Sequence, residues 1–163
     1  METRKIARMG LLTALALILS YVESLIPAFV AVPGVKMGLA NIVVVFALYT
    51  LGPGEAAIIS IIRVLLSSLL FGSILSLSYS AAGAVISLLS MIILMKTKIF
   101  GVTSVSVTGG VFHNLGQILV ACLVLETDVV LYYLPVLILR GTITGAVIGI
   151  ASSIVIKRLQ KSI

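Results

Sequence analysis

The sequence predicts an all-α integral membrane protein: a single bundle of six transmembrane helices with both termini on the cytoplasmic side. Of its 163 residues, 61% are hydrophobic and only 10% are charged, and the mean hydropathy is +1.32. A water-soluble fold of this composition would expose far too much apolar surface. Basic residues gather at the two ends and in one connection, which is typical of cytoplasmic segments under the positive-inside rule.

The first helix is expected at about residues 6–26, directly after the basic cluster at residues 4–8. It ends near Glu23 and Pro27, where charge and proline indicate the outer surface. The segment 27–36 is apolar but broken by two prolines and a glycine. We therefore expect a loop that folds back over the outer face as a candidate lid.

The second and third helices are expected at about 37–51 and 55–71, joined by a tight Gly-Pro-Gly turn at 52–54. A helix of about 16 residues spans roughly 24 Å, which is less than a hydrocarbon core of about 30 Å. We expect the ends of these helices to lie in a cavity or beneath their neighbours. Glu55 either caps the third helix or has a functional role.

The last three helices follow the same pattern of apolar runs separated by charged connections. Lys96 and Lys98 place one connection on the cytoplasmic side, whereas Glu126 and Asp128 mark an outer turn. The even number of spans agrees with basic residues at both ends and predicts a multi-pass protein of the plasma membrane. The expected ranges are about 77–95, 103–125 and 129–156.

Several kinds of chemistry are excluded or made improbable by composition. A single cysteine, Cys122, permits no internal disulfide, and the single histidine, His113, permits no bis-histidine haem or histidine-based zinc site. The net charge of +6 reports membrane topology through its distribution and does not indicate nucleic-acid binding. We expect no cofactor and no metal. The sequence contains no phosphate-binding loop, so any ATP hydrolysis must come from separate subunits.

Two arginines within apolar helices are the most informative feature. A charge at the bilayer centre costs roughly 2.5 to 3.5 kcal/mol even on the lenient insertion scale. Arg63 shares a helix face with Ser67, and Arg140 shares one with Thr144 and Tyr133. Every carboxylate falls near a predicted helix end, so none is expected at the depth of either arginine. We favour a cavity that holds an anionic or strongly polar ligand over a purely structural network of carbonyls and water.

The fifth helix carries a second polar stripe. Gly109, His113 and Gln117 are four residues apart on one face, with Asn114 beside them. Amide and imidazole groups within lipid need hydrogen-bond partners. They either bond neighbouring helices together or line the same cavity as the arginines.

Further candidates lie on the outer half of the molecule: Lys36, Asn41, Tyr79 and Tyr133. The tyrosines alternatively serve as anchors at the membrane interface. Lys36 is the only basic residue expected on the outer side, where it would meet an incoming anion. Small residues form another stripe, at Gly141, Gly145 and Gly149. This stripe indicates close helix packing, either within the chain or against a partner membrane subunit.

Four segments, at residues 33–41, 63–72, 113–117 and 132–137, resemble the Gx transporter family, also labelled heptaprenyl diphosphate synthase component I. That family in turn resembles the substrate-capture (S) components of energy-coupling factor transporters, which are six-helix membrane proteins that bind vitamins and related nutrients. The resemblance implies an outward-opening substrate pocket, a coupling membrane subunit and ATPase subunits as partners. S components commonly carry Ala-x-x-x-Ala on their first helix. Here the nearest matches are Gly10 with Ala14 and Ala16 with Ser20.

The expected function is therefore a substrate-binding subunit of such an importer, which captures a small polar or anionic nutrient or cofactor precursor. The alternative is a non-transporting membrane subunit associated with prenyl diphosphate or quinone metabolism, or with flavin-based extracellular electron transfer. Prenyl chain elongation by this chain alone is not expected. Synthases of that class hold diphosphate through magnesium on aspartate clusters, and Asp128 is the only aspartate.

Overall fold

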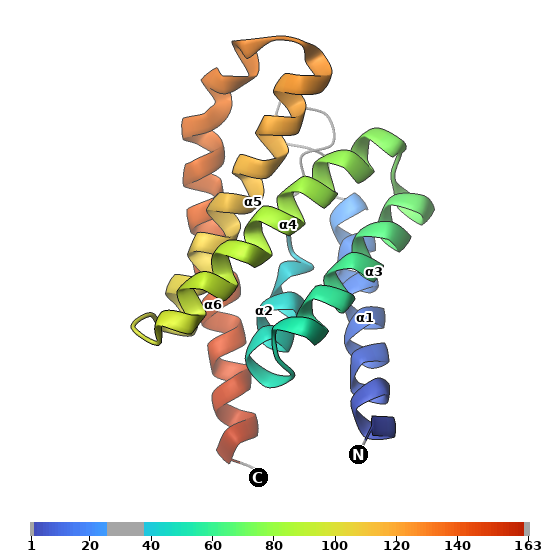
Figure 1. Cartoon of the computed structure of the whole chain (residues 1–163), viewed down its shortest axis with the longest axis vertical. Coiled ribbons are helices and arrows are strands. Elements are labelled where there is room, and N and C mark those ends of the chain that lie inside the picture. The colour runs from blue at the N-terminus through green and yellow to red at the C-terminus, as the bar shows by residue number, and fades with distance from the viewer. Residues whose placement is uncertain (1, 26–37, 162–163) are drawn as a thin grey trace.

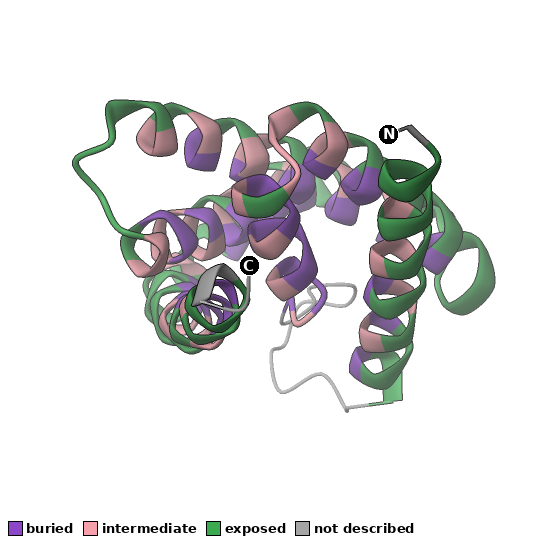
Figure 2. Ribbon diagram, turned by 90° about the horizontal axis from the view of Figure 1, so that it is seen from below, coloured by how far each residue is buried: buried purple, intermediate pink, exposed green. Residues whose placement is uncertain are grey.

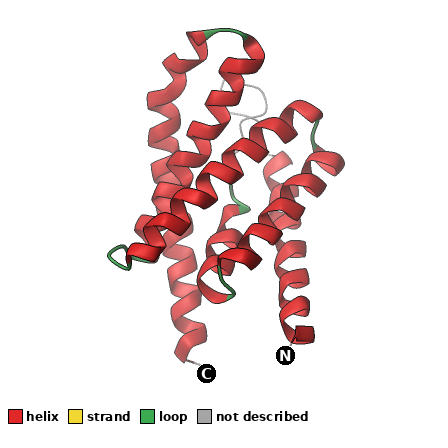
Figure 3. Ribbon diagram, viewed as in Figure 1, coloured by secondary structure: helices red, strands yellow, loops and turns green. Residues whose placement is uncertain are grey.

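The computed structural model describes residues 2–25 and 38–161, which form helices joined by short turns (Figures 1 and 3). This confirms the all-α class. The helices are α1 (Glu2–Leu25), α2 (Asn41–Thr50), α3 (Pro53–Phe71), α4 (Ile74–Thr97), α5 (Val102–Leu125), the 3₁₀ helix η1 (Asp128–Tyr133) and α6 (Leu134–Lys161).

Five of the helices in the described part of the chain are long and apolar enough to cross a membrane. The exception is α2, whose ten residues reach only about 15 Å. It begins later than the predicted residue 37, because Gly38 adopts a left-handed backbone with φ +84 and the turn after it precedes the helix. The amino-terminal end of α1 and the carboxy-terminal end of α6 lie at the same end of the bundle (Figure 1).

The helices pack in two groups that meet at α2 and along α3 and α4. α5 lies between α4 and α6 and shares its largest contacts with them, whereas α1 packs against α3 and α2. α2 also contacts α6, and its valines belong to the larger apolar core. Seen from below, buried residues line the inside of the bundle and exposed residues its rim (Figure 2). Because the exposed rim is rich in leucine and isoleucine, it fits a lipid environment.

The glycine stripe of α6 faces α5. A Cβ added at Gly141, Gly145 or Gly149 would in each case come within 2.7 Å of a backbone atom of α5. Small residues are needed here because the two backbones approach closely. The structure thus accounts for this stripe by packing within the chain.

Two helix starts differ in detail from the predicted ranges. Residues 128–133 form η1, and α6 begins at Leu134 with Pro135 as its second residue. Arg140 therefore lies in the second turn of α6, within the apolar stretch Asp128–Leu159 that η1 and α6 form together. α4 begins at Ile74, three residues earlier than predicted, because the Ser73 hydroxyl accepts a hydrogen bond from the Ser76 backbone N–H (3.1 Å) and caps the helix.

Candidate ligand-binding site

The amino-terminal end of α2 lies inside the bundle. The backbone N–H of Asn41 donates to the Gly38 carbonyl at 2.9 Å and starts the helix. Ala40, at the N-cap position, provides no side-chain cap. The backbone N–H of Gly38 instead donates to the carboxylate of Glu23 on α1. The first N–H groups of α2 bond to the carbonyls of residues 38–40, and the helix dipole makes this end of α2 electropositive. The carboxylate of Glu23 binds directly before it, at the N–H of Gly38.

Glu23 also links two helices that are far apart in sequence. Its side chain is buried, with 6% of its surface exposed. Its charge interacts with both Arg63 on α3 and Arg140 on α6. Three charged side chains from three helices therefore gather around the start of α2. Together with Asn41 and His113 we call them the central polar cluster.

Arg63 is the most deeply buried charge of the cluster, with 5% of its surface exposed. Its Nη2 donates to Oδ1 of Asn41 at 3.1 Å. Its Nε has no hydrogen-bond partner within the described residues. One turn later the buried hydroxyl of Ser67 donates to the Val64 carbonyl at 3.3 Å. The guanidinium group of Arg63 is therefore held through Nη2, whereas its Nε–H is left without an acceptor among the described residues. An unused buried donor of this kind costs free energy.

Arg140 is half-buried. Its Nη1 is covered yet lacks a hydrogen-bond partner among residues 2–25 and 38–161. The described cluster therefore sets two guanidinium groups against one carboxylate. The excess of one positive charge and the two unused donors suit an additional anion or strongly polar acceptor.

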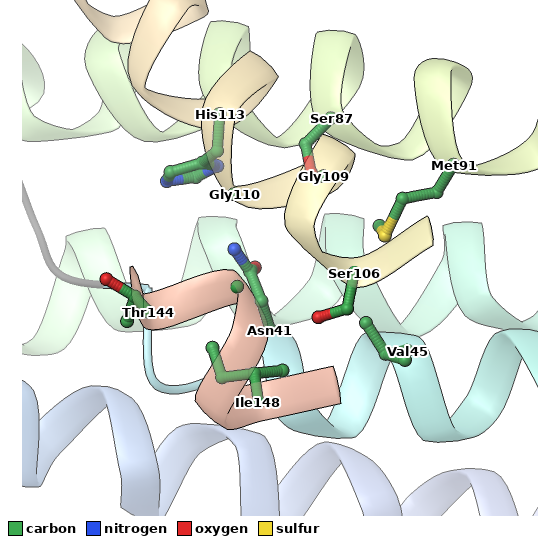
Figure 4. Close-up of a pocket in the computed structure, with 11 residues that line it drawn as sticks. Asn41, Val45, Ser87, Met91, Ser106, Gly109, Gly110, His113, Thr144 and Ile148 are labelled. Carbon is green, nitrogen blue, oxygen red and sulfur yellow. The ribbon is translucent and has the colours of Figure 1, made fainter. Parts of the chain in front are cut away.

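A small cavity lies next to the cluster, between α2, α4, α5 and α6 (Figure 4). Asn41 lines it from α2 and His113 from α5, and the His113 ring packs against Gly83, where an added Cβ would come within 2.9 Å of Nδ1. The cavity measures about 10 Å³, which is room for about one water molecule. The predicted chamber for a ligand is therefore not open in this conformation.

The remaining polar residues of α5 divide into two kinds. Nδ2 of Asn114 donates to the Leu137 carbonyl at 2.7 Å and ties α5 to α6, which is the structural alternative considered for this stripe. Gln117 is completely buried, and neither atom of its amide has a hydrogen-bond partner in the described part of the chain. Such a group costs free energy unless a water molecule or ligand satisfies it.

The other predicted site residues lie elsewhere. Tyr79 is 1% exposed and packs in a second apolar cluster with Ile118 and Leu137. Tyr133 is 38% exposed at the junction of η1 and α6, where an interface anchor would stand. Lys36 falls outside the described residues.

The structure also shows what the predicted residues of α1 and the start of α3 contact. Glu55, in the first turn of α3, forms an ion pair with Lys5 of α1. Of the two small-residue pairs on α1, Ala16 and Ser20 are buried within the bundle. Gly10 and Ala14 are exposed, so this pair alone is open to a partner.

Sequence reasoning missed Glu23, which it placed at the outer surface. A signal was present, because Ala16, Ser20 and Glu23 fall on one helical face and two of them are small. Small residues on a membrane helix indicate a packed face. The carboxylate on that stripe therefore points into the bundle.

The family comparison agrees with the sequence resemblance. The model of the family described as heptaprenyl diphosphate synthase component I matches residues 12–155, which include every member of the central polar cluster. No curated protein and no solved structure is significantly similar to the chain. Because the match covers most of the chain, the protein belongs to the heptaprenyl diphosphate synthase component I family, also known as the Gx transporter family.

Proposed function

We propose that this protein is the substrate-binding membrane subunit of an importer of the energy-coupling factor type, and that it captures a small anionic or polar nutrient or cofactor precursor. In this proposal the protein spans the plasma membrane with both termini in the cytoplasm. The observation that carries it is the central polar cluster, in which the described residues supply one carboxylate for two guanidinium groups.

The chemistry of the cluster favours an anionic group on the ligand. Arg63 and Arg140 each retain a buried N–H without a partner in the described chain, and charge-assisted hydrogen bonds to such donors are stronger than neutral ones. The amino-terminal end of α2 adds its dipole on the same side. Asn41 and Gln117 supply amide groups for the polar, uncharged part of a ligand.

Capture requires the bundle to open. The cavity beside the cluster admits about one water molecule, so the helices around the cluster must separate for a nutrient-sized molecule to enter. Arg140 lies in the second turn of α6, near the predicted outer end. We therefore place entry on the outer side, between the ends of α1 and α6.

Energy and coupling would come from other subunits. The proposed partners are a coupling membrane protein and ATPase subunits. Gly10 and Ala14, which are exposed on α1, are the proposed contact with the coupling protein, because nothing in the described chain lies within 4 Å of a Cβ added at Gly10.

Thermal unfolding of the purified protein with a panel of vitamins and cofactor precursors tests this function. A ligand at 100 times its dissociation constant should stabilise the protein by about 2.7 kcal/mol. Arg63→Gln and Arg140→Gln should abolish the stabilisation, whereas the matched control Lys98→Gln, in the exposed connection after α4, should retain it. If no compound in a broad panel stabilises the wild-type protein, the proposal fails.

The family description favours a second candidate, a non-transporting subunit associated with prenyl diphosphate metabolism. Association with quinone metabolism or flavin-based electron transfer belongs to the same alternative. Affinity purification from membranes separates the two. Copurification with a prenyl synthase or flavoprotein and without an ATPase would support the second candidate. Copurification with ATPase subunits would support import.

A further inference from the structure

An apolar groove lies between α1 and α6, with α2 as its floor. Two adjoining hollows of about 280 and 430 Å³ form it, and both are lined by Leu12 and Phe46. In Figures 1 and 2, α1 and α6 stand on either side of α2 toward the end where both termini lie. We call this feature the α1–α6 groove. It is distinct from the central polar cluster and shares no lining residue with it.

The groove is apolar along its length and polar at one end. Leu15 and Val155 line the hollow farther from the termini. Arg8 and Tyr49 line the hollow nearer to them. The Tyr49 hydroxyl is buried and has no hydrogen-bond partner in the described part of the chain. The guanidinium group of Arg8 and the unpartnered hydroxyl of Tyr49 therefore lie at the predicted cytoplasmic end of the apolar α1–α6 groove.

We propose that the α1–α6 groove binds one membrane phospholipid with an anionic headgroup. One acyl chain lies along Leu12, Leu15 and Phe46, and the phosphate is held by Arg8 and the Tyr49 hydroxyl. The distance along α1 from Arg8 to Leu15 is about 10 Å, so the groove takes the part of an acyl chain next to the headgroup. Basic pockets between helices at the cytoplasmic surface favour anionic lipids.

A lipid explains the groove better than a partner helix does. Helices associate in membranes through small residues that allow close backbone approach, whereas leucine, isoleucine and phenylalanine line this groove. The small exposed residues of α1, Gly10 and Ala14, lie on a different face of that helix from Arg8 and Leu15. A coupling subunit docked on Gly10 and Ala14 would leave the groove open to lipid.

Native mass spectrometry tests the proposal with the purified full chain and an equimolar mixture of phosphatidylglycerol and phosphatidylcholine that carry the same acyl chains. The wild-type protein should retain one phosphatidylglycerol in preference to phosphatidylcholine. Arg8→Gln should reduce that retention about fivefold, since one basic side chain at the membrane surface contributes about 1 kcal/mol to binding of anionic lipid. Leu15→Trp, which fills the groove, should reduce retention of both lipids.

The matched control is Arg4→Gln, which removes a charge one helical turn earlier from a residue that does not line the groove. It should leave retention unchanged. Equal retention of the two lipids, or equal losses in the Arg4 and Arg8 variants, would overturn the proposal. So would a photoreactive analogue in place of Leu15 that crosslinks in cells to a protein and not to lipid. A thermal unfolding midpoint equal to that of the wild-type protein shows that each variant keeps its fold.

Discussion

Replacement of Glu23 by glutamine should destabilise the protein more than any other single loss of a carboxylate. The substitution keeps the size of the side chain and removes its charge. Glu23 accepts a hydrogen bond from the Gly38 backbone N–H and compensates Arg63 and Arg140. After the change, both guanidinium groups would remain in the bundle without any carboxylate from the described chain.

The burial of the three side chains sets the magnitude. Glu23 and Arg63 are 6% and 5% exposed, so water screens their interaction little. Removal of one partner from a buried ion pair in direct contact costs about 3 to 5 kcal/mol. Glu23 and Arg63 interact through their charges, so we take the low end of that range. Arg140 is half-buried and contributes less. We expect Glu23→Gln to lower the free energy of unfolding by about 3 kcal/mol.

A double-mutant cycle measured by equilibrium unfolding in detergent isolates the interaction. If Glu23 and Arg63 stabilise one another, the double variant Glu23→Gln/Arg63→Gln should be more stable than the sum of the single effects implies, by roughly 1 to 3 kcal/mol. Glu126→Gln is the control, because Glu126 is exposed after α5, and it should change stability little. Additive effects of Glu23 and Arg63, or a Glu23→Gln variant as stable as wild type, would refute this account of the cluster.

Three further predictions concern packing and topology. Gly141→Ala should destabilise the protein by about 1 to 3 kcal/mol in detergent unfolding, because the new Cβ would meet the Gly110 carbonyl at 2.7 Å. Gly10→Ala, with nothing within 4 Å, should be neutral and serves as its control. Asn114→Ala should cost about 1 kcal/mol in the same assay, because it removes the hydrogen bond to Leu137, and a neutral result would contradict the role given to that bond. A reporter fused to either terminus should be located in the cytoplasm. A reporter located outside the cell, at either terminus, would contradict the proposed orientation.

The sequence was sufficient to predict the fold class because lipid imposes a simple rule. Every backbone polar group must be satisfied within the chain, so apolar runs of sufficient length become helices. The rule determines where a helix exists more firmly than where it ends. It placed the start of α2 at residue 37, although the left-handed turn at Gly38 delays it to Asn41. It also continued α6 back through residues 128–133, where η1 forms.

The candidate site was predictable in part. Arg63 and Asn41, both chosen from sequence, form a hydrogen bond, because buried polar groups in an apolar chain must find one another. Glu23 was missed because depth in the bilayer was judged from position within a predicted helix. A carboxylate near the end of α1 can meet Arg63 because α2 starts inside the bundle. That geometry depends on tertiary contacts that no local pattern contains.

The short second helix accounts for both proposed binding sites. A helix of ten residues reaches only about 15 Å, and the positive end of its dipole lies among α1, α3 and α6, where it favours an anion. Glu23 supplies that anion through the N–H of Gly38, and its charge favours the approach of Arg63 and Arg140. Toward its other end, α2 lies between α1 and α6 without filling the space between them, which leaves an apolar groove. The central polar cluster thus favours a charged ligand, and the α1–α6 groove favours a hydrocarbon chain. Glu23→Gln should therefore change ligand binding and leave lipid retention unchanged.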